Sequence, residues 1–178
     1  MKRKLAAAIL LPMMGLSSAA LADDGKINFT GNIIEAGCQV NSTINSPISV
    51  KLGDVAKTAF PTSGATAAKT KFTLVLSNCP ATLQGKLITV QYDGTPDTIN
   101  NNYLQLTGYG TTGVASGVAI QLLNGSGSEL VLGAASDSKT IAATGDTNLD
   151  FFARYIATTA DVKAGTANST VNFTLAYN

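Results

Sequence analysis

The sequence of 178 residues contains no histidine and no tryptophan, and it has only two cysteines. The absence of histidine excludes Ser-His-Asp and Cys-His catalysis and every zinc site that uses imidazole. Two cysteines cannot form a four-thiolate metal site. Without tryptophan, the Cys…Trp…Cys signature of antibody-type domains is also missing. These absences exclude many common classes of enzyme, and we expect no catalytic residues, no metal and no cofactor.

Charged residues are scarce, at 13% of the chain, and the formal net charge is +1. Lys2, Arg3 and Lys4 stand at the N-terminus with no acidic residue beside them. Without residues 1–22, the chain has nine basic and eleven acidic residues, which gives a formal charge of −2. A near-neutral chain lacks the basic surface of a nucleic-acid-binding protein, so no nucleic-acid partner is expected.

The first 22 residues have the pattern of a secretion signal. The basic start is followed by a short apolar run and by an A-x-A cleavage motif that ends at Ala22. A membrane anchor is the alternative, but Pro12 and Gly15 interrupt the run, which is shorter than the roughly 20 apolar residues of a span. We predict a signal peptide over 1–22, with cleavage after Ala22 or, alternatively, after Ala19, and no later membrane span.

Export would place Cys38 and Cys79 in an oxidising compartment, where two thiols persist as a disulfide. The bond would close a loop of about 40 residues, which the chain-entropy relation values at about 3–4 kcal/mol of stability. The alternative is a pair of buried free thiols. We predict the disulfide.

The rest of the chain has the pattern of short strands separated by turn-forming residues. Apolar and polar residues alternate in several runs, and no run of 12 residues has a sustained helical period, although one short turn is expected over 64–69. The pattern predicts an all-β protein of one domain, as a two-layer sandwich. The alternating runs cover residues 27–33, 72–76, 88–92, 118–122, 151–157 and 171–177.

Both ends of this region have the pattern of an amphipathic strand, although chain termini are usually poorly ordered unless something holds them. One apolar face near the N-terminus consists of Gly25, Ile27, Phe29, Gly31 and Ile33. The corresponding face at the C-terminus consists of Val171, Phe173, Leu175 and Tyr177. From the pattern alone, the two could be the ordinary first and last strands of a closed sandwich.

Several motifs together resemble the pilin subunits of chaperone–usher fimbriae, most closely the major rod subunits of the type 1 group. Residues 25–31 (GKINFTG) resemble the family's G-x-[VI]-x-F-x-G segment, and residues 77–79 (SNC) resemble its second-cysteine motif. Residues 151–158 (FFARYIAT) resemble its late F-x-A-R-Y-x-A-T strand. The chain also has the penultimate aromatic residue, Tyr177, and the glycine fourteenth from the end, Gly165.

The resemblance implies an incomplete immunoglobulin-like sandwich that lacks its last strand and is completed by a donor strand from a neighbouring subunit. It implies an N-terminal donor extension over 23–34 and a pilin domain over 35–178. The implied donor positions are Gly25, Ile27, Phe29, Gly31 and Ile33. The implied residues of the groove and of the chaperone-binding strand are Gly165, Val171, Phe173, Leu175, Tyr177 and Asn178.

The resemblance also implies partners and a location. A periplasmic chaperone would deliver the subunit to an outer-membrane usher, where copies of the chain and other pilus subunits assemble into an extracellular fimbrium that supports cell adhesion. The alternatives are a minor tip or adaptor subunit, a glycan-binding adhesin subunit, and an exported enzyme. The residues after position 22 leave no room for the N-terminal lectin domain that tip adhesins of the family add, which favours a structural rod subunit.

Overall fold

The structure, a computed structural model of the chain, describes residues 25–178. The signal peptide predicted over 1–22 and its two cleavage positions lie outside the described residues. The chain divides into two units, Met1–Ile33 and Ile34–Asn178. In the first unit, the described residues 25–33 are extended and belong to no helix or strand. Within residues 25–178, no helix is both long and apolar enough to cross a membrane.

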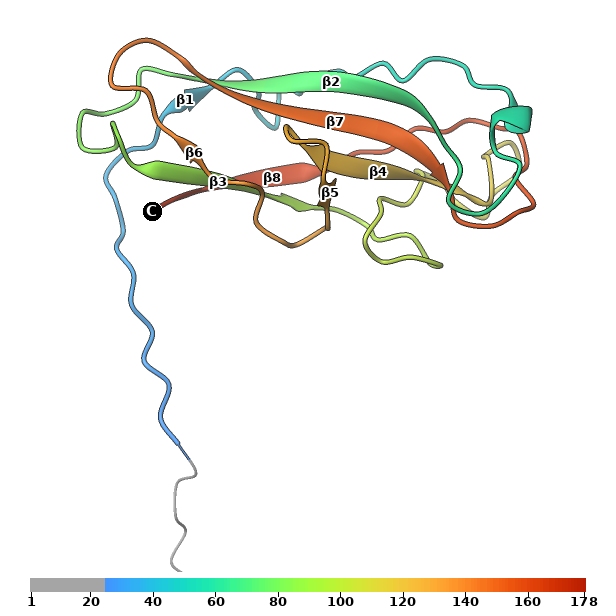
Figure 1. The fold of residues 1–178 in the computed structure, drawn as a ribbon, viewed down its shortest axis with the longest axis horizontal. Coiled ribbons are helices and arrows are strands. Elements are labelled where there is room, and N and C mark those ends of the chain that lie inside the picture. The colour runs from blue at the N-terminus through green and yellow to red at the C-terminus, as the bar shows by residue number, and fades with distance from the viewer. Residues whose placement is uncertain (1–24) are drawn as a thin grey trace, which may run out of the picture. The chain divides into compact units, whose positions relative to one another are not determined.

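The unit Ile34–Asn178 is a sandwich of two antiparallel sheets, with β2, β7 and β4 in one layer and β3 and β8 in the other (Figure 1). The first sheet has the order β1-β2-β7-β4-β5, and the second has the order β6-β3-β8. A short 3-10 helix, η1 (Lys57–Ala59), precedes β2. The strands are β1 (Gln39–Val40), β2 (Thr66–Ser77), β3 (Leu87–Asp93), β4 (Val118–Asn124), β5 (Glu129–Leu130), β6 (Lys139–Thr140), β7 (Thr147–Ala157) and β8 (Asn172–Tyr177).

The predicted all-β sandwich is confirmed, and the five predicted runs from residue 72 onward coincide with β2, β3, β4, β7 and β8. The short turn predicted over 64–69 is wrong, because β2 already begins at Thr66, which pairs with Ile156 of β7. The register shifts between Ala67 and Thr70, and Ala68 has a φ of 58°. Pairing with β7 therefore overrides the local preference and accommodates the irregularity as a bulge.

Four aromatic rings join the two sheets at the centre of the core. Phe72 and Phe151 are register partners across β2 and β7, and their ring centroids are 5.7 Å apart. Tyr92 of β3 meets Phe151 edge to face at 5.3 Å and lies 6.3 Å from Phe173, its register partner in β8. Edge-to-face contacts of this kind add to the stability that burial provides. The cluster supplies the core of a domain that has no tryptophan.

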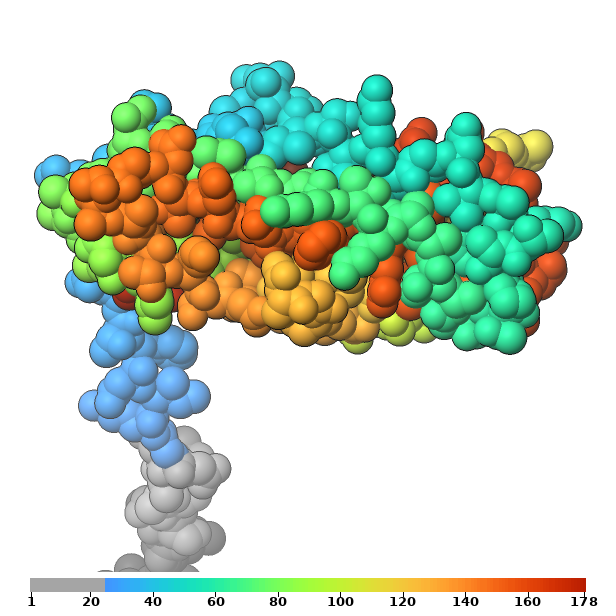
Figure 2. All heavy atoms as spheres, turned by 45° about the horizontal axis from the view of Figure 1, so that its top comes forward, coloured from blue at the N-terminus to red at the C-terminus, as the bar shows by residue number. Residues whose placement is uncertain are grey.

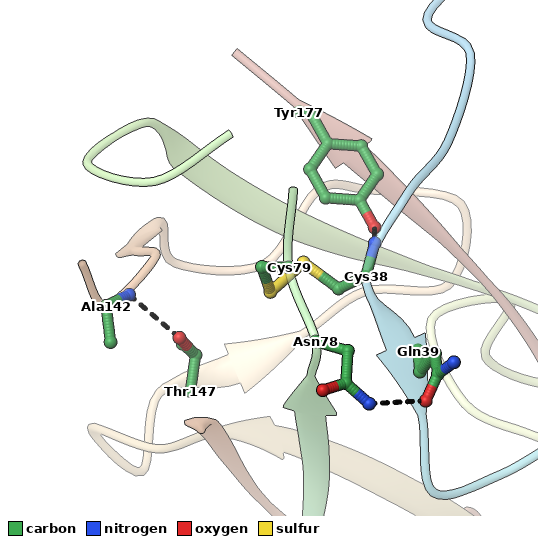
Figure 3. The surroundings of a disulfide bond; sticks show 7 residues. All are labelled: Cys38, Gln39, Asn78, Cys79, Ala142, Thr147 and Tyr177. Carbon is green, nitrogen blue, oxygen red and sulfur yellow. Dashed lines mark hydrogen bonds between the residues drawn. A yellow bond between two sulfur atoms is a disulfide. The ribbon is translucent and has the colours of Figure 1, made fainter. Parts of the chain in front are cut away.

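The predicted disulfide between Cys38 and Cys79 is confirmed (Figure 3). It joins the start of β1 to the end of β2, next to the register pair Gln39–Ser77. Asn78 lies between Ser77 and Cys79 with a φ of 49°, and its Nδ2 donates to Gln39 Oε1 at 2.8 Å. The bond thus fixes the first residues of the sandwich to its longest strand.

Candidate functional site

Strand β8 lies at an open edge of the three-stranded sheet. One side of β8 pairs with β3, from the register pair Ile88 and Tyr177 to the register pair Asp93 and Asn172. The other side has no strand partner among the described residues. Along β8, exposed side chains alternate with half-buried ones that face the core. An unpaired row of main-chain N–H and C=O groups is a template for pairing with another strand.

A second edge, which has no strand partner within residues 25–178, faces the same region. Residues 47–55 belong to no helix or strand; Ile48, Val50 and Leu52 are half-buried, while Ser49 and Lys51 between them are exposed. Residues 49–55 make no backbone–backbone hydrogen bond with any other described residue. The segment therefore has the side-chain alternation of a strand but lacks the ladder of one.

A cavity of about 1010 Å³ lies between this segment and the approach to β8. Its walls are residues 47–55 on one side and residues 162–171 on the other. Figure 2 shows the segment that precedes β2, in cyan to teal, along one border of the molecule, with red atoms of the later wall beside it. The floor is mainly apolar and consists of Phe60, Phe72, Leu74, Tyr92, Leu104, Val118, Ile120, Leu122 and Phe173. This space is a hydrophobic groove, bordered by two edges that lack strand partners in the part of the chain that the structure describes.

The structure places the sequence-predicted groove residues in two groups. Gly165, Val171 and Phe173 line the cavity. Leu175 and Tyr177 face the core from the same strand but lie beyond the cavity lining. The cavity therefore lies beside the first half of β8, and the second half continues toward the disulfide.

Tyr177 links the C-terminal strand to the disulfide (Figure 3). Its hydroxyl accepts a hydrogen bond from the Cys38 N–H at 3.0 Å. A Cβ atom on Gly37 would lie 2.8 Å from the same hydroxyl oxygen, so the tyrosine fits closely against a residue without a side chain. The two ends of the sandwich chain are thus held together at this point.

The last residue continues the β3–β8 ladder. The Asn178 N–H donates to the Leu87 carbonyl oxygen at 2.8 Å, and an oxygen of Asn178 accepts from the Leu87 N–H at 3.1 Å. The C-terminus is therefore held in the sheet to its final residue.

Gly165 is required by a close approach of two backbone segments. A Cβ atom at this position would lie 2.5 Å from the Ala115 nitrogen, and the Ala115 N–H donates to the Thr166 oxygen at 3.0 Å. The Thr166 N–H in turn donates to the carbonyl oxygen of Gly113 at 2.8 Å. Only a residue without a side chain lets this wall of the groove pack against residues 113–115.

We expect Gly165→Ala to lower the free energy of unfolding by about 1–3 kcal/mol, because the added methyl group must displace main-chain atoms. Urea denaturation of the purified chain measures the change. Ala164→Ser, at an exposed neighbouring position, is the control and should change the free energy of unfolding by less than about 0.5 kcal/mol. Equal effects of the two substitutions would contradict the packing role of Gly165.

The sequence-predicted donor residues lie in the unit Met1–Ile33 and are strongly exposed. The exposed fractions of Ile27, Phe29 and Ile33 are 78%, 91% and 102%. A Cβ atom on Gly25 or Gly31 would meet nothing within 4 Å. Large apolar side chains exposed on one face of an extended segment are a typical binding surface.

The sequence analysis did not predict that residues 47–55 form a wall of the groove or that Tyr92 lies on the floor of the groove. The alternation of Ile48, Val50 and Leu52 was a detectable signal for the wall, because a period of two indicates a half-buried extended segment. The sequence carries no comparable signal for the position of Tyr92 in the groove, because that depends on which strands pair.

These features define a class of protein: an immunoglobulin-like sandwich that is open along one edge, together with an exposed apolar segment. The model of the fimbrial protein family matches residues 27–178, and the chain belongs to this family. It is a fimbrial subunit of chaperone–usher pili, a structural protein and not an enzyme. Such subunits polymerise with one another in extracellular pili on the cell surface.

Individual relatives agree with the family. The chain is 34% identical to a type-1 fimbrial protein subunit of Serratia marcescens, over 95% of this chain and 98% of the relative. Its sequence is 39% identical to that of an antigen and type I fimbria protein of Burkholderia pseudomallei. The crystal structure of that protein matches with a TM-score of 0.60 and covers 86% of this chain and 97% of that one. The crystal structure of the P pilus rod subunit PapA is 21% identical in sequence, with a TM-score of 0.65, and covers 80% of this chain and 100% of PapA. At this level of identity, the likeness supports only the assignment of the fold.

Proposed function

We propose that the chain is the repeating rod subunit of a fimbrium and that it polymerises by donor-strand exchange. Residues Gly25–Ile33, the donor segment, insert into the groove of the next copy and complete its sandwich. The observation that carries the proposal is the presence of both complementary parts in one chain. One is an apolar groove of about 1010 Å³ between two edges that have no strand partner among the described residues, and the other is an exposed apolar segment. The donor extension then covers 23–34, the pilin domain covers 35–178, and a signal peptide precedes both.

Physical complementarity supports this arrangement. A docked strand can form main-chain hydrogen bonds with the free edge of β8 and with residues 49–55. Its alternate side chains enter the groove, and burial of Ile27, Phe29 and Ile33 would contribute about 1.5–3 kcal/mol each. Because the donor segment and the groove are different surfaces, the contact does not close on itself and produces a filament.

Before assembly, the open edge needs protection. An exposed edge strand with apolar side chains is an aggregation hazard. We therefore infer that a periplasmic chaperone supplies a temporary strand that pairs with β8, and that the outer-membrane usher is where the donor segment of the next subunit replaces it. Val171, Phe173, Leu175 and Tyr177 would contact that strand, and the C-terminal Asn178 lies at the end of the same edge.

A synthetic peptide of residues 25–34 tests the exchange mechanism on the purified full-length chain. We expect the peptide to bind, to raise the unfolding temperature through preferential binding to the folded state, and to block fibre growth. A peptide of the same composition in scrambled order is the control. If the peptide neither binds at concentrations that saturate the detection method nor changes fibre growth, the donor assignment fails.

Immunogold electron microscopy tests the position in the fimbrium. A repeating rod subunit should be labelled along the whole shaft, because every copy offers both a donor segment and a groove. Label confined to the tip would overturn the rod assignment in favour of a minor tip or adaptor subunit.

A further inference from the structure

The lining of the groove carries a net positive charge. Among the described residues, its charged side chains are those of Lys51, Lys57 and Lys163, which we call the lysine rim, and that of Asp54, and all four are exposed. Asp161 lies two positions before Lys163 but outside the lining. The lining therefore holds three of the nine basic residues that follow position 22 and only one of the eleven acidic residues, although this part of the chain has a formal charge of −2.

The charges of the lysine rim have no partner of opposite sign within the domain. The one ion pair among residues 25–178 joins Lys71 to Asp150, and neither of these residues lines the groove. Glu35 is also exposed and outside that pair, and it is the only acidic residue between Gly25 and Gly37. Both sets of charges are thus free to meet opposite charges on another copy of the chain.

Two of the three lysines lie at the end of the sandwich that is opposite to the disulfide. Lys57 belongs to η1, and Figure 1 shows this short helix, in teal, at the opposite end from β1. Lys163 pairs with Ser116, two positions before β4, and β4 begins beside the last residue of β7. Since β2 begins beside the end of β7, the disulfide, which follows the other end of β2, lies far along the sheet.

A donor segment in the groove runs toward this end. All ladders between the named strands of both sheets are antiparallel, so we align the segment antiparallel to β8. β8 runs toward the disulfide, where the Tyr177 hydroxyl accepts from the Cys38 N–H. Its antiparallel partner therefore runs away from the disulfide, and the residues that follow the donor segment emerge near Lys57 and Lys163.

The position of Phe29 in the groove determines that of Glu35. Phe29 lies beside Phe173 or Val171, the alternating core-facing residues that line the cavity. In an antiparallel pair, each step forward along one strand is a step back along the other, so Glu35, six positions later, lies beside residue 167 or residue 165. Both positions belong to the same wall as Lys163 and are only two to four residues from it. The flexible stem of a lysine side chain spans such a separation.

We propose that Glu35 of an incoming copy binds the lysine rim of the groove that its donor segment fills, and that this contact makes assembly faster and tighter at low salt. The inference rests on the proposed donor-strand exchange and adds a charged contact to it. Main-chain pairing and apolar burial can hold many apolar strands, whereas charge complementarity favours one partner and one direction of insertion. The groove therefore prefers segments that are followed by an acidic residue.

Peptide titration tests the contact. The peptide spans residues 25–36 with both termini blocked, so that its end charges do not imitate Glu35, and it is compared with its Glu35→Gln variant. The proteins are the full-length wild type, a rim variant and a control variant, and each variant replaces three exposed lysines by glutamine. The rim variant replaces Lys51, Lys57 and Lys163, and the control variant replaces Lys69, Lys86 and Lys139, which lie outside the lining.

We expect Glu35→Gln to bind the wild type about two- to fivefold more weakly at about 0.01 M salt, the effect of an exposed ion pair. The difference should shrink at about 0.15 M salt, because the screening length falls from about 30 Å to about 8 Å. The rim variant should bind both peptides equally, and the control variant should discriminate between them as the wild type does. Lys26→Gln, at the other end of the peptide, should have the same effect on the wild type and on the rim variant.

The outcomes separate the two proposals. If the wild type does not bind the parent peptide, donor-strand exchange itself fails. If the wild type binds the parent and Glu35→Gln equally tightly at low salt, the role of Glu35 is overturned. A control variant that loses the discrimination as fully as the rim variant shows general charge attraction and overturns the role of the rim, and coupling of the rim to Lys26 instead of Glu35 overturns the direction of insertion.

Discussion

Phe29→Asp is expected to abolish fibre formation while leaving the folded domain intact. The phenylalanine is 91% exposed in the single chain, so its replacement removes no internal contact. In an assembled fibre the new carboxylate would enter an apolar groove. Burial of an unpaired charge destabilises such a contact by far more free energy than burial of one aromatic ring contributes to it. Electron microscopy and sedimentation of the purified chain measure the loss of fibres, and circular dichroism measures the fold.

Asn28→Asp is the matched control, because it introduces the same charge on the opposite face of the same segment. It should form fibres at close to the wild-type level. A periplasmic chaperone should still capture Phe29→Asp, since capture uses the groove and not the donor segment. Fibres of Phe29→Asp, or equal loss in both variants, would refute the assignment of the donor face.

Replacement of Cys38 and Cys79 by serine is expected to have the largest effect on stability, a loss of about 3–4 kcal/mol. The disulfide spans a sequence separation of 41 and holds the start of β1 beside the end of β2. The Cys38 N–H also donates to Tyr177, so release of this residue weakens the hold on the C-terminal strand. Because domains are stable by only about 5–15 kcal/mol in total, the loss is a large fraction of the whole.

Urea denaturation of the double variant gives the magnitude, and reduction of the wild-type chain should shift the midpoint in the same direction. Thr43→Ser, at an exposed turn near β1, is the control and should have a small effect. If the double variant unfolds within about 0.5 kcal/mol of the wild type, a range typical of surface substitutions, the disulfide does not stabilise the domain as we expect.

The sequence predicted the longer strands well because each buries one face, and alternation with a period of two records that burial directly. Phe72, Leu74 and Leu76 in β2 are an example. The turn predicted over 64–69 failed because pairing of β2 with β7 overrode a weak local preference. The alternation over 27–33 predicts that one face is to be buried, but it does not say against which chain.

The groove itself could not be predicted from the residues alone, because it is the place where a strand is missing. Its two walls, residues 47–55 and 162–171, are more than 100 positions apart, and only the strand order brings them together. Gly165 shows the same limit: its position near the C-terminus was visible as a family motif, but its physical reason, contact with the backbone at Ala115, depends on tertiary structure.

The most direct measurement is a cryo-electron microscopy reconstruction of fibres assembled from the purified chain. We predict density for residues 25–33 of each subunit between β8 and residues 47–55 of its neighbour, with Phe29 inside the groove. Density for the segment within its own subunit's groove, or fibres in which the groove stays empty, would contradict donor-strand exchange.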